Sequence, residues 1–415
     1  MKVALSIALA AGILAGGPAV AADLQVAPWL QLDVAGLADL RIVRTSGLRN
    51  SNDGGFGKVR FGADETGAAT GGRVGDASLV GTALLPNGIA LVGHVRAEPY
   101  QRTALDVIEA YVRWRPVSTS AWRWQVKVGA FFPSISLEND GIAWSARYTL
   151  TPSAINSWVG EELRTIGGEG RLEWRGAVDR IAIQGALYGW NDPAGLMLAY
   201  RGWAFTDRPL GLIDRQQVPN EIAFHTGRVP PVYFDLAREI DDRVGYYAGA
   251  SWQRDGVGKL AVLRYDNRAD SKARRTVFAW ETKFWSVAAQ TELADGLVLM
   301  AQAMDGWTQV WPSAIQRSVT DFSAAYLLLG YDVGRWRFGL RGDLFATRER
   351  SLAPRVELSE HGSALTAAIS YRLADGLRLT AELLRVDSQR QQREAVGLPA
   401  RGRETQAQFS IRYYF

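Results

Sequence analysis

The last nine residues of the chain, AQFSIRYYF (Ala407–Phe415), decide how the rest of the sequence is interpreted. Phe409, Ile411, Tyr413 and Phe415 fall on one side of an extended backbone, and more polar residues alternate with them. This period of two is typical of a β-strand with one apolar face. Chain ends of soluble domains usually fray, so an apolar ending indicates a strand whose apolar face is covered, either by a core or by lipid.

The first 22 residues have the three-part pattern of a secretory signal peptide. A lysine near the front is followed by an apolar stretch and by small residues around Ala19–Ala21. We expect cleavage near Ala21 or Ala22, so that residues 23–415 form one exported domain. The apolar stretch is short and interrupted by Gly16–Pro18, and no later run reaches the ~20 residues of a transmembrane helix.

The composition narrows the class of protein. The chain has no cysteine, which excludes disulfides, thiol nucleophiles and zinc–thiolate sites. Its 43 glycines and 43 aromatic residues (15 Trp, 14 Tyr, 14 Phe) are typical of alternating strands. The formal net charge of +4 is small for 415 residues and does not indicate a nucleic-acid partner.

Alternating segments of about ten residues recur along the chain, as in transmembrane β-barrels. We predict an all-β, antiparallel transmembrane barrel of about 16 strands (14–18), in which the last strand pairs with the first near Trp29–Leu40 so that no sheet edge remains. Short turns alternate with long polar connections, which is the expected asymmetry between periplasmic turns and external loops. The predicted short turns are Asn87–Gly88, Pro116–Ser120, Gly176–Asp179, Asp255–Gly256, Asp295–Gly296, Val333–Gly334 and Asp375–Gly376. The predicted long loops are Asn50–Gly75, Phe132–Glu162, Asn191–Ile240, Gly306–Arg317 and Gln389–Gly402.

Aromatic residues gather beside the short turns, where a barrel places its periplasmic aromatic girdle. The residues concerned are Trp114, Trp122, Trp124, Trp174, Trp252, Tyr331, Trp336 and Tyr371. Tryptophans also cluster in ordinary β cores. Their association with one class of turn favours the barrel in the bacterial outer membrane.

If one face of each strand contacts lipid, the opposite face lines the lumen. Parity places an excess of basic residues there: Arg96, Arg113, Arg123, Lys127, Arg171, Arg175, Arg264, Lys283, Arg337, Arg341 and Arg378. Such a wall favours anions. The alternative is that Arg–Glu pairs on neighbouring strands cancel these charges locally.

Two long segments, 132–162 and 191–240, combine aromatic and apolar residues with charges. The first carries the acidic residues Glu138, Asp140, Glu161 and Glu162, which would face the basic wall across a constriction if the segment folds into the lumen. It could instead pack on other external loops or on another subunit. The second could form a lid, a partial plug or a ligand-contacting surface.

The signal peptide, the alternating strands and the terminal phenylalanine together resemble the Gram-negative outer-membrane porin superfamily. The stretch VGAFFPSISLEN (128–139) is similar to a strand-to-loop region of the phosphate- and anion-selective porins. This resemblance implies a possible homotrimer that exchanges solutes by diffusion. It also implies that Phe415 serves as the signal recognised by the machinery that inserts barrels, and that lipid and lipopolysaccharide surround the wall.

The predicted function is therefore a passive, water-filled channel for small hydrophilic solutes, with a preference for anions. No cofactor or metal is expected. The alternatives are a substrate-specific transporter, a plugged structural or adhesive barrel, and a barrel enzyme. The enzyme is the weakest, because only His94, His225 and His361 are present and neither a G-x-S-x-G nor an H-E-x-x-H motif occurs.

Overall fold

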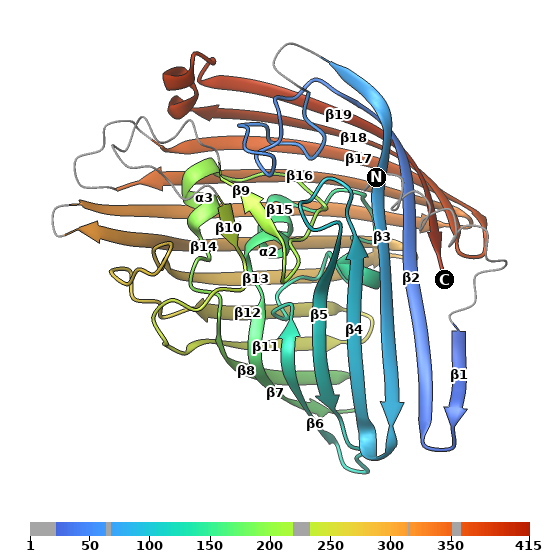
Figure 1. Ribbon diagram of the computed structural model, residues 1–415. Helices are drawn as coiled ribbons and strands as arrows, with labels where there is room; N and C mark the ends of the chain where they lie inside the picture. The colour runs from blue at the N-terminus through green and yellow to red at the C-terminus, as the bar shows by residue number, and fades with distance from the viewer. Residues whose placement is uncertain (1–21, 64–67, 219–232, 314–315, 351–357) are drawn as a thin grey trace.

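The structure is a computed structural model that describes residues 22–63, 68–218, 233–313, 316–350 and 358–415. The predicted signal peptide, except for Ala22, lies outside these ranges. Sixteen antiparallel strands form a closed barrel, which confirms the predicted fold (Figure 1). The strands are β2 (Leu30–Thr45), β3 (Ala69–Leu85), β4 (Ile89–Ala97), β5 (Leu105–Trp114), β6 (Trp122–Phe131), β7 (Thr165–Arg175), β8 (Asp179–Gly189), β11 (Gly245–Arg254), β12 (Gly258–Asp266), β13 (Glu281–Ala294), β14 (Leu297–Ser313), β15 (Gln316–Val333), β16 (Trp336–Glu349), β17 (Glu360–Ala374), β18 (Leu377–Arg390) and β19 (Arg401–Tyr414).

The chain termini meet in the wall, because β19 pairs with β2. The sequence predicted this pairing near Trp29–Leu40, and the observed register lies further along the first strand, from Gln406 opposite Thr45 to Tyr414 opposite Leu37. A short strand that the sequence did not indicate, β1 (Ala22–Ala27), pairs with the start of β2 beyond the end of β19. The wall therefore continues past the last residue of the chain.

Seven short turns join the strands at one end of the barrel, and each predicted turn is found. One of these turns contains Asn87–Gly88, where both residues have left-handed backbone (φ 62° and 77°). Asparagine and glycine tolerate this conformation best, and its twist matches the twist of the flanking strands. The sequence signal and the observed turn therefore have one physical cause.

The connections at the other end differ from prediction in two places. The predicted loop Asn50–Gly75 ends early, because β3 already begins at Ala69. Gly306–Arg317 is not a long loop, because β14 and β15 continue through it with Trp307 opposite Asp321 and Gln309 opposite Val319. The prediction was wrong because polar residues at the ends of tall strands can face solvent on both sides while the backbone ladder continues. Residues 314–315 lie outside the described ranges.

Aromatic rings cluster on the outer wall beside the short turns. The ring centroids of Trp336 and Tyr371 are 4.7 Å apart, and those of Trp114 and Trp124 are 4.4 Å apart. Amphipathic rings at the level of the lipid headgroups agree with the predicted girdle. Among the described helices, none is long and apolar enough to cross a membrane.

Candidate functional site

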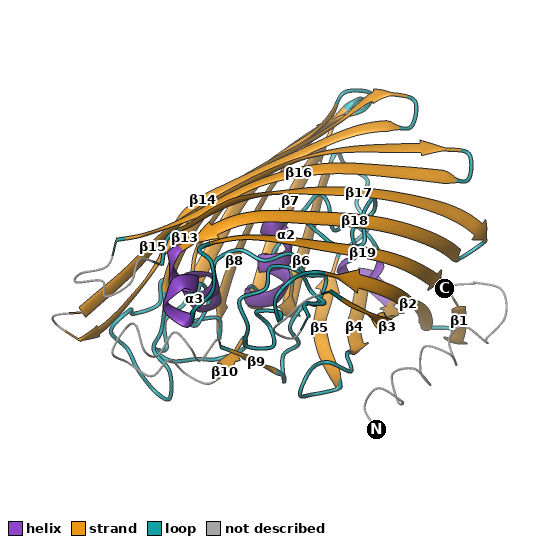
Figure 2. Ribbon diagram, turned by 90° about the horizontal axis from the view of Figure 1, so that it is seen from above, coloured by secondary structure: helices purple, strands orange, loops and turns teal. Residues whose placement is uncertain are grey.

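The lumen holds segments of three external connections, residues 46–63, 132–164 and 190–217. Helices α2 (Ala154–Glu162) and α3 (Leu196–Arg201) belong to the second and third, and the strands enclose them (Figure 2). The side chain of Ser153 caps α2 by accepting a hydrogen bond from the backbone N–H of Asn156. The short hairpin of β9 (Arg215–Gln217) and β10 (Tyr233–Asp235) extends the third connection. We call the inward segments 132–164 and 190–217 the plug.

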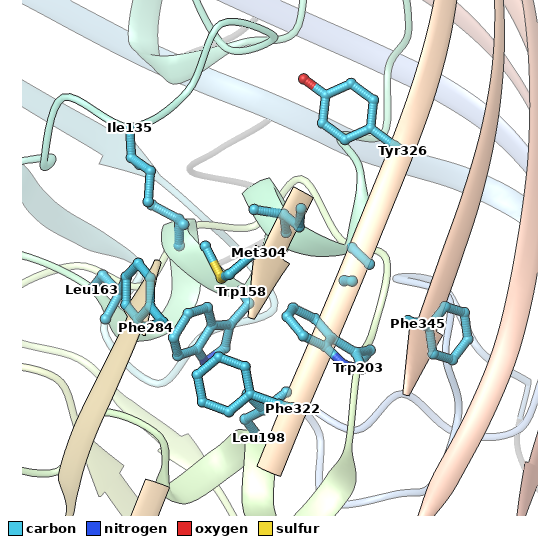
Figure 3. Close-up of a cluster of buried hydrophobic side chains, with 14 of the residues drawn as sticks. Ile135, Trp158, Leu163, Leu198, Trp203, Phe284, Met304, Phe322, Tyr326 and Phe345 are labelled. Carbon is cyan, nitrogen blue, oxygen red and sulfur yellow. The ribbon is translucent and has the colours of Figure 1, made fainter. Parts of the chain in front are cut away.

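An apolar cluster joins the plug to one side of the wall (Figure 3). The ring of Trp158 packs against Trp203 of the plug at 5.9 Å between centroids. It also packs against Phe284 of β13 and Phe322 of β15, at 5.5 and 5.2 Å. Because these rings are almost fully buried, this side of the lumen is closed to water.

Arg341 of β16 anchors the plug to the wall. Its guanidinium is fully buried and donates to Glu138 of the plug at 2.6 Å and to Asp343 of the same strand at 2.8 Å. It also donates to the backbone carbonyls of Thr151 and Pro152, at 2.8 and 3.0 Å. One arginine thus holds both a carboxylate and the turn that precedes α2.

The four acidic residues predicted to face a basic wall have different surroundings. Glu138 reaches the wall through Arg341, whereas Asp140 is exposed. Glu161 pairs with Arg201, which also belongs to the plug. Glu162 accepts from the backbone N–H groups of Gly195 and Leu198 at the start of α3, at 2.5 and 2.7 Å.

Glu162 is buried, and desolvation raises its pKa to about 7 despite these two hydrogen bonds and nearby Arg201. Its carboxylate joins the two parts of the plug, because it lies at the end of α2 and contacts the start of α3. The sequence showed an acidic residue here but not its partner, which lies 33 residues further along the chain.

A second network of charges crosses the opposite side of the lumen. Arg60 of the first connection pairs with Glu98 at 2.7 Å and with Asp207 of the plug at 2.9 Å. Asp207 also contacts Arg41 of β2 at 2.5 Å, and Arg41 contacts Asp39 at 2.6 Å. The guanidinium groups of Arg41 and Arg60 hold the pKa of Asp207 well below its usual range, although burial opposes this. Cations and anions alternate here, so the network is close to neutral.

A small enclosed cavity of about 20 Å³ lies between this network and the plug. Its lining includes Arg96, Arg412, Asp207, Asn139 and Trp144. Three buried polar atoms in the lining have no hydrogen-bond partner in the described part of the chain: Asn139 Oδ1, Asn156 Oδ1 and Trp144 Nε1. A cavity of this size holds one water molecule, so the polar path through the middle of the lumen is narrow.

Most of the predicted pore-lining basic residues lie on the inner face of the wall. These are Arg96, Arg113, Arg123, Lys127, Arg171, Arg175, Arg337, Arg341 and Arg378. Local pairing neutralises several of them, for example Lys127 with Glu169 at 3.3 Å and Arg337 with Asp332 at 2.5 Å.

The prediction that Arg264 and Lys283 line the lumen was wrong, because both side chains lie on the outer face. The guanidinium of Arg264 lies over the ring of Trp285, which is 53% exposed. Lys283 pairs with Asp266 and Glu281 on the same face. Parity failed on β12 and β13 because their apolar residues, such as Tyr265 and Phe284, face the apolar plug rather than lipid.

A basic group lies at the periplasmic mouth, on the inner face of β5, β6 and β12 and in the turn after β5. Arg113, Arg115, Arg123 and Lys259 make no ion pair within 4 Å in the described residues. Arg113 is directly opposite Lys127 in the register, and like charges in that position repel. A pocket of about 100 Å³ between Arg115, Arg123, Arg171 and Arg175 contains one carboxylate, Glu173. We call Arg113, Arg115, Arg123 and Lys259 the mouth arginines and lysine.

The described histidines form no dyad with a nucleophile. His94 is buried on the inner wall, 3.9 Å from Glu109, and neither ring nitrogen has a hydrogen-bond partner. His361 is exposed on the outer face of β17. His225 lies outside the described ranges. The expectation that the protein is not an enzyme stays a prediction.

In the part of the chain that the structure describes, one group of carboxylates has the spacing of metal ligands. Oxygen atoms of Asp192, Glu239 and Asp241 lie within 4.8 Å of one another at the external end of the barrel. Burial, followed by Asp241 and Glu239, raises the pKa of Asp192 to about 7. Oxygen donors of this kind suit a divalent cation, but Asp192 already accepts from the backbone N–H groups of Ile240 and Asp241.

Comparison with solved structures identifies the fold. The outer membrane channel DcaP of Acinetobacter baumannii superimposes with a TM-score of 0.53 at 10% identity, over 95% of this chain and 100% of that one. The chain has the fold of the outer-membrane porins. In-vitro folded OmpT of Vibrio cholerae (0.51, 10%, 95% and 100%) and an anion-selective porin of Comamonas acidovorans (0.50, 11%, 93% and 100%) are similar to the same extent. No protein-family model and no curated protein matches the sequence.

These similarities confirm the predicted barrel, and they agree with the bacterial outer membrane as its location. Similarity at identities near 10% shows only the fold, so the function has to be argued from the residues of this chain.

Proposed function

We propose that the protein is an outer-membrane porin through which small hydrophilic solutes diffuse, with a preference for anions. Sixteen strands enclose more space than wall side chains alone can fill. The wall is polar on its inner face along β2, β3, β4 and β19. A polar wall around a partly filled lumen supports passive diffusion of hydrated solutes.

The plug gives this porin a narrow route. The apolar cluster around Trp158 excludes solutes from the side of β13 and β15, so diffusion follows the charged side, past Arg96 and Arg412. A cavity of about 20 Å³ there predicts a small conductance that grows when the plug moves.

The observation that carries the anion preference is the surplus of cations at the periplasmic mouth. In the middle of the lumen, ion pairs such as Arg60–Glu98 and Arg41–Asp39 neutralise each other. At the mouth, the mouth arginines and lysine have no such partner among the described residues. Unpaired cations around a narrow opening attract anions and repel cations, so the mouth rather than the plug discriminates by charge.

The test is the reversal potential of single channels in a planar bilayer under a KCl gradient. The wild-type protein should give the sign for chloride over potassium, and Arg113→Gln with Arg115→Gln and Arg123→Gln should move the potential toward zero. The matched control is Arg264→Gln, which removes one positive charge from the outer face. A folded protein that never conducts contradicts the porin proposal. Unchanged selectivity in the triple variant contradicts only the claim that the mouth arginines and lysine set the preference for anions.

The remaining parts of the proposal concern partners. One form of Vibrio cholerae OmpT is described as a trimer, and we propose the same assembly for this chain. Lipopolysaccharide and lipid surround the wall, and the machinery that inserts barrels recognises Phe415. If no conductance is found, a plugged structural barrel becomes the better interpretation, because an apolar cluster already joins the plug to the wall.

A further inference from the structure

The outer face of β18, β19 and β2 carries a basic group that the channel does not use. Arg44, Arg385, Arg401 and Arg403 are exposed there, and Asp387 is the acidic residue among them. Arg385 and Arg403 donate to the two carboxylate oxygens of Asp387, at 3.0 and 2.8 Å. Their side chains remain 49% and 59% exposed. The five residues, which we call the outer basic group, have a formal charge of +3.

The height of this group on the wall can be estimated from the periplasmic girdle. Tyr413 lies opposite Leu377, beside the short turn Asp375–Gly376, and Arg403 precedes it by ten residues on the same strand and face. A strand tilted by about 40° and rising ~3.4 Å per residue climbs roughly 26 Å over ten residues. The apolar band of an outer-membrane barrel is about 25 Å tall. Arg401, Arg403 and Asp387 therefore lie at the headgroups of the outer leaflet. Arg385 is opposite Thr405, just below them, and Arg44 is opposite Ala407, lower on the wall.

Two apolar grooves in the outer wall flank the group. The first, of about 520 Å³, is formed on the outer face by Ile42, Arg44, Ala367, Ala381, Leu383, Ala407 and Phe409. The second, of about 890 Å³, runs past Ala303, Ala325, Leu344 and Ala346 to Asp387 and Arg401. Small side chains make the floor of each groove, and a cation lies at the margin of each.

We propose that this face binds a phosphorylated lipid of the outer leaflet with several acyl chains, of the lipid A type. Phosphate oxygens would accept hydrogen bonds from Arg385, Arg401 and Arg403, and acyl chains would fill the two grooves. Guanidinium groups match phosphate in charge and geometry, and apolar grooves below a basic headgroup site match an acylated lipid. A two-fold dimer through this face fits less well, because an isologous contact would bring the cations of both copies together.

The probe is diphosphoryl lipid A, and the protein is the full chain refolded in detergent. Bound lipid is counted by native mass spectrometry during titration. Arg385→Gln with Arg401→Gln and Arg403→Gln should weaken binding about tenfold or more, since three charge-assisted contacts are lost. The matched control is Arg350→Gln, because Arg350 pairs with Asp321 on the outer face of the neighbouring strands with a similarly exposed side chain (51%).

A second variant separates the grooves from the charges. Ala381→Trp with Ala407→Trp fills the floor of the smaller groove without changing the charge, and should weaken binding of lipid A while leaving the fold intact. Dephosphorylated lipid A should bind the wild-type protein as weakly as lipid A binds the arginine variant. Equal binding of lipid A to wild type and both variants overturns the proposal. So does a dimer or trimer that forms through this face, detected when Arg385→Cys or Arg403→Cys cross-links two copies. Conductance is independent of these outcomes.

Discussion

The attachment of the plug through Arg341 yields the sharpest prediction. Arg341→Met keeps much of the length of the side chain but removes every donor. The lost hydrogen bonds reach Glu138, Asp343 and four oxygens of Thr149, Thr151, Pro152 and Thr366. Removing one partner of a buried ion pair typically costs about 3–5 kcal/mol, because the other charge stays buried without compensation.

This loss of free energy should destabilise the packing of the plug against the wall and not the barrel itself. The backbone ladders of β16 with β15 and β17 do not involve the side chain of Arg341. We therefore expect Arg341→Met to insert normally, and its channels to show larger and noisier current than wild type, because residues 132–164 detach more often from the wall. Hydrogen exchange should rise by a factor of ~10² or more at the amides of α2, corresponding to about 3 kcal/mol.

A double-mutant cycle with Glu138→Gln isolates the pair. If the two residues act together, the double variant should be affected less than the sum of the single variants, because the neutral amide removes the buried charge that Arg341→Met leaves unpaired. Unchanged exchange at α2 and unchanged current in Arg341→Met would refute the reasoning that this arginine holds the plug.

Three further changes test other parts of the structure. Trp158→Ala should cost about 3–5 kcal/mol of plug stability and increase conductance, because the ring that seals the lumen between Phe284 and Phe322 is lost; single-channel recording checks this. Between pH 4.5 and 7 the folded protein keeps the proton of Glu162 that the unfolded chain releases. The stability of the plug should therefore fall by roughly 3 kcal/mol as pH rises through that window. Hydrogen exchange of α3 at pH 5 and 8 measures this loss, and exchange that does not depend on pH in this way would contradict the raised pKa. Gly36→Val should impair membrane insertion as strongly as deletion of Phe415, because a Cβ at Gly36 would lie 2.0 Å from the phenylalanine ring; equal insertion of variant and wild type would show that the ring has no part in assembly.

The sequence alone determined the barrel and the alternation of apolar and polar faces along its strands. Strand period, turn residues and the apolar ending at Phe415 act over a few residues, so a single strand already shows which of its faces repels water. The closure of β19 on β2 also follows, because an exposed sheet edge is not tolerated in lipid. These predictions were confirmed in the part of the chain that the structure describes.

Tertiary structure decided what fills the lumen. Arg341 and Glu138 are separated by 203 residues in the chain, and no local pattern links them. Arg264 and Lys283 were placed on the wrong face for the same reason. Parity distinguishes an apolar face from a polar one, but an apolar face can meet either lipid or an apolar plug. Only the packing of Trp158 on Phe284 shows that the plug, and not lipid, covers the apolar side of β13.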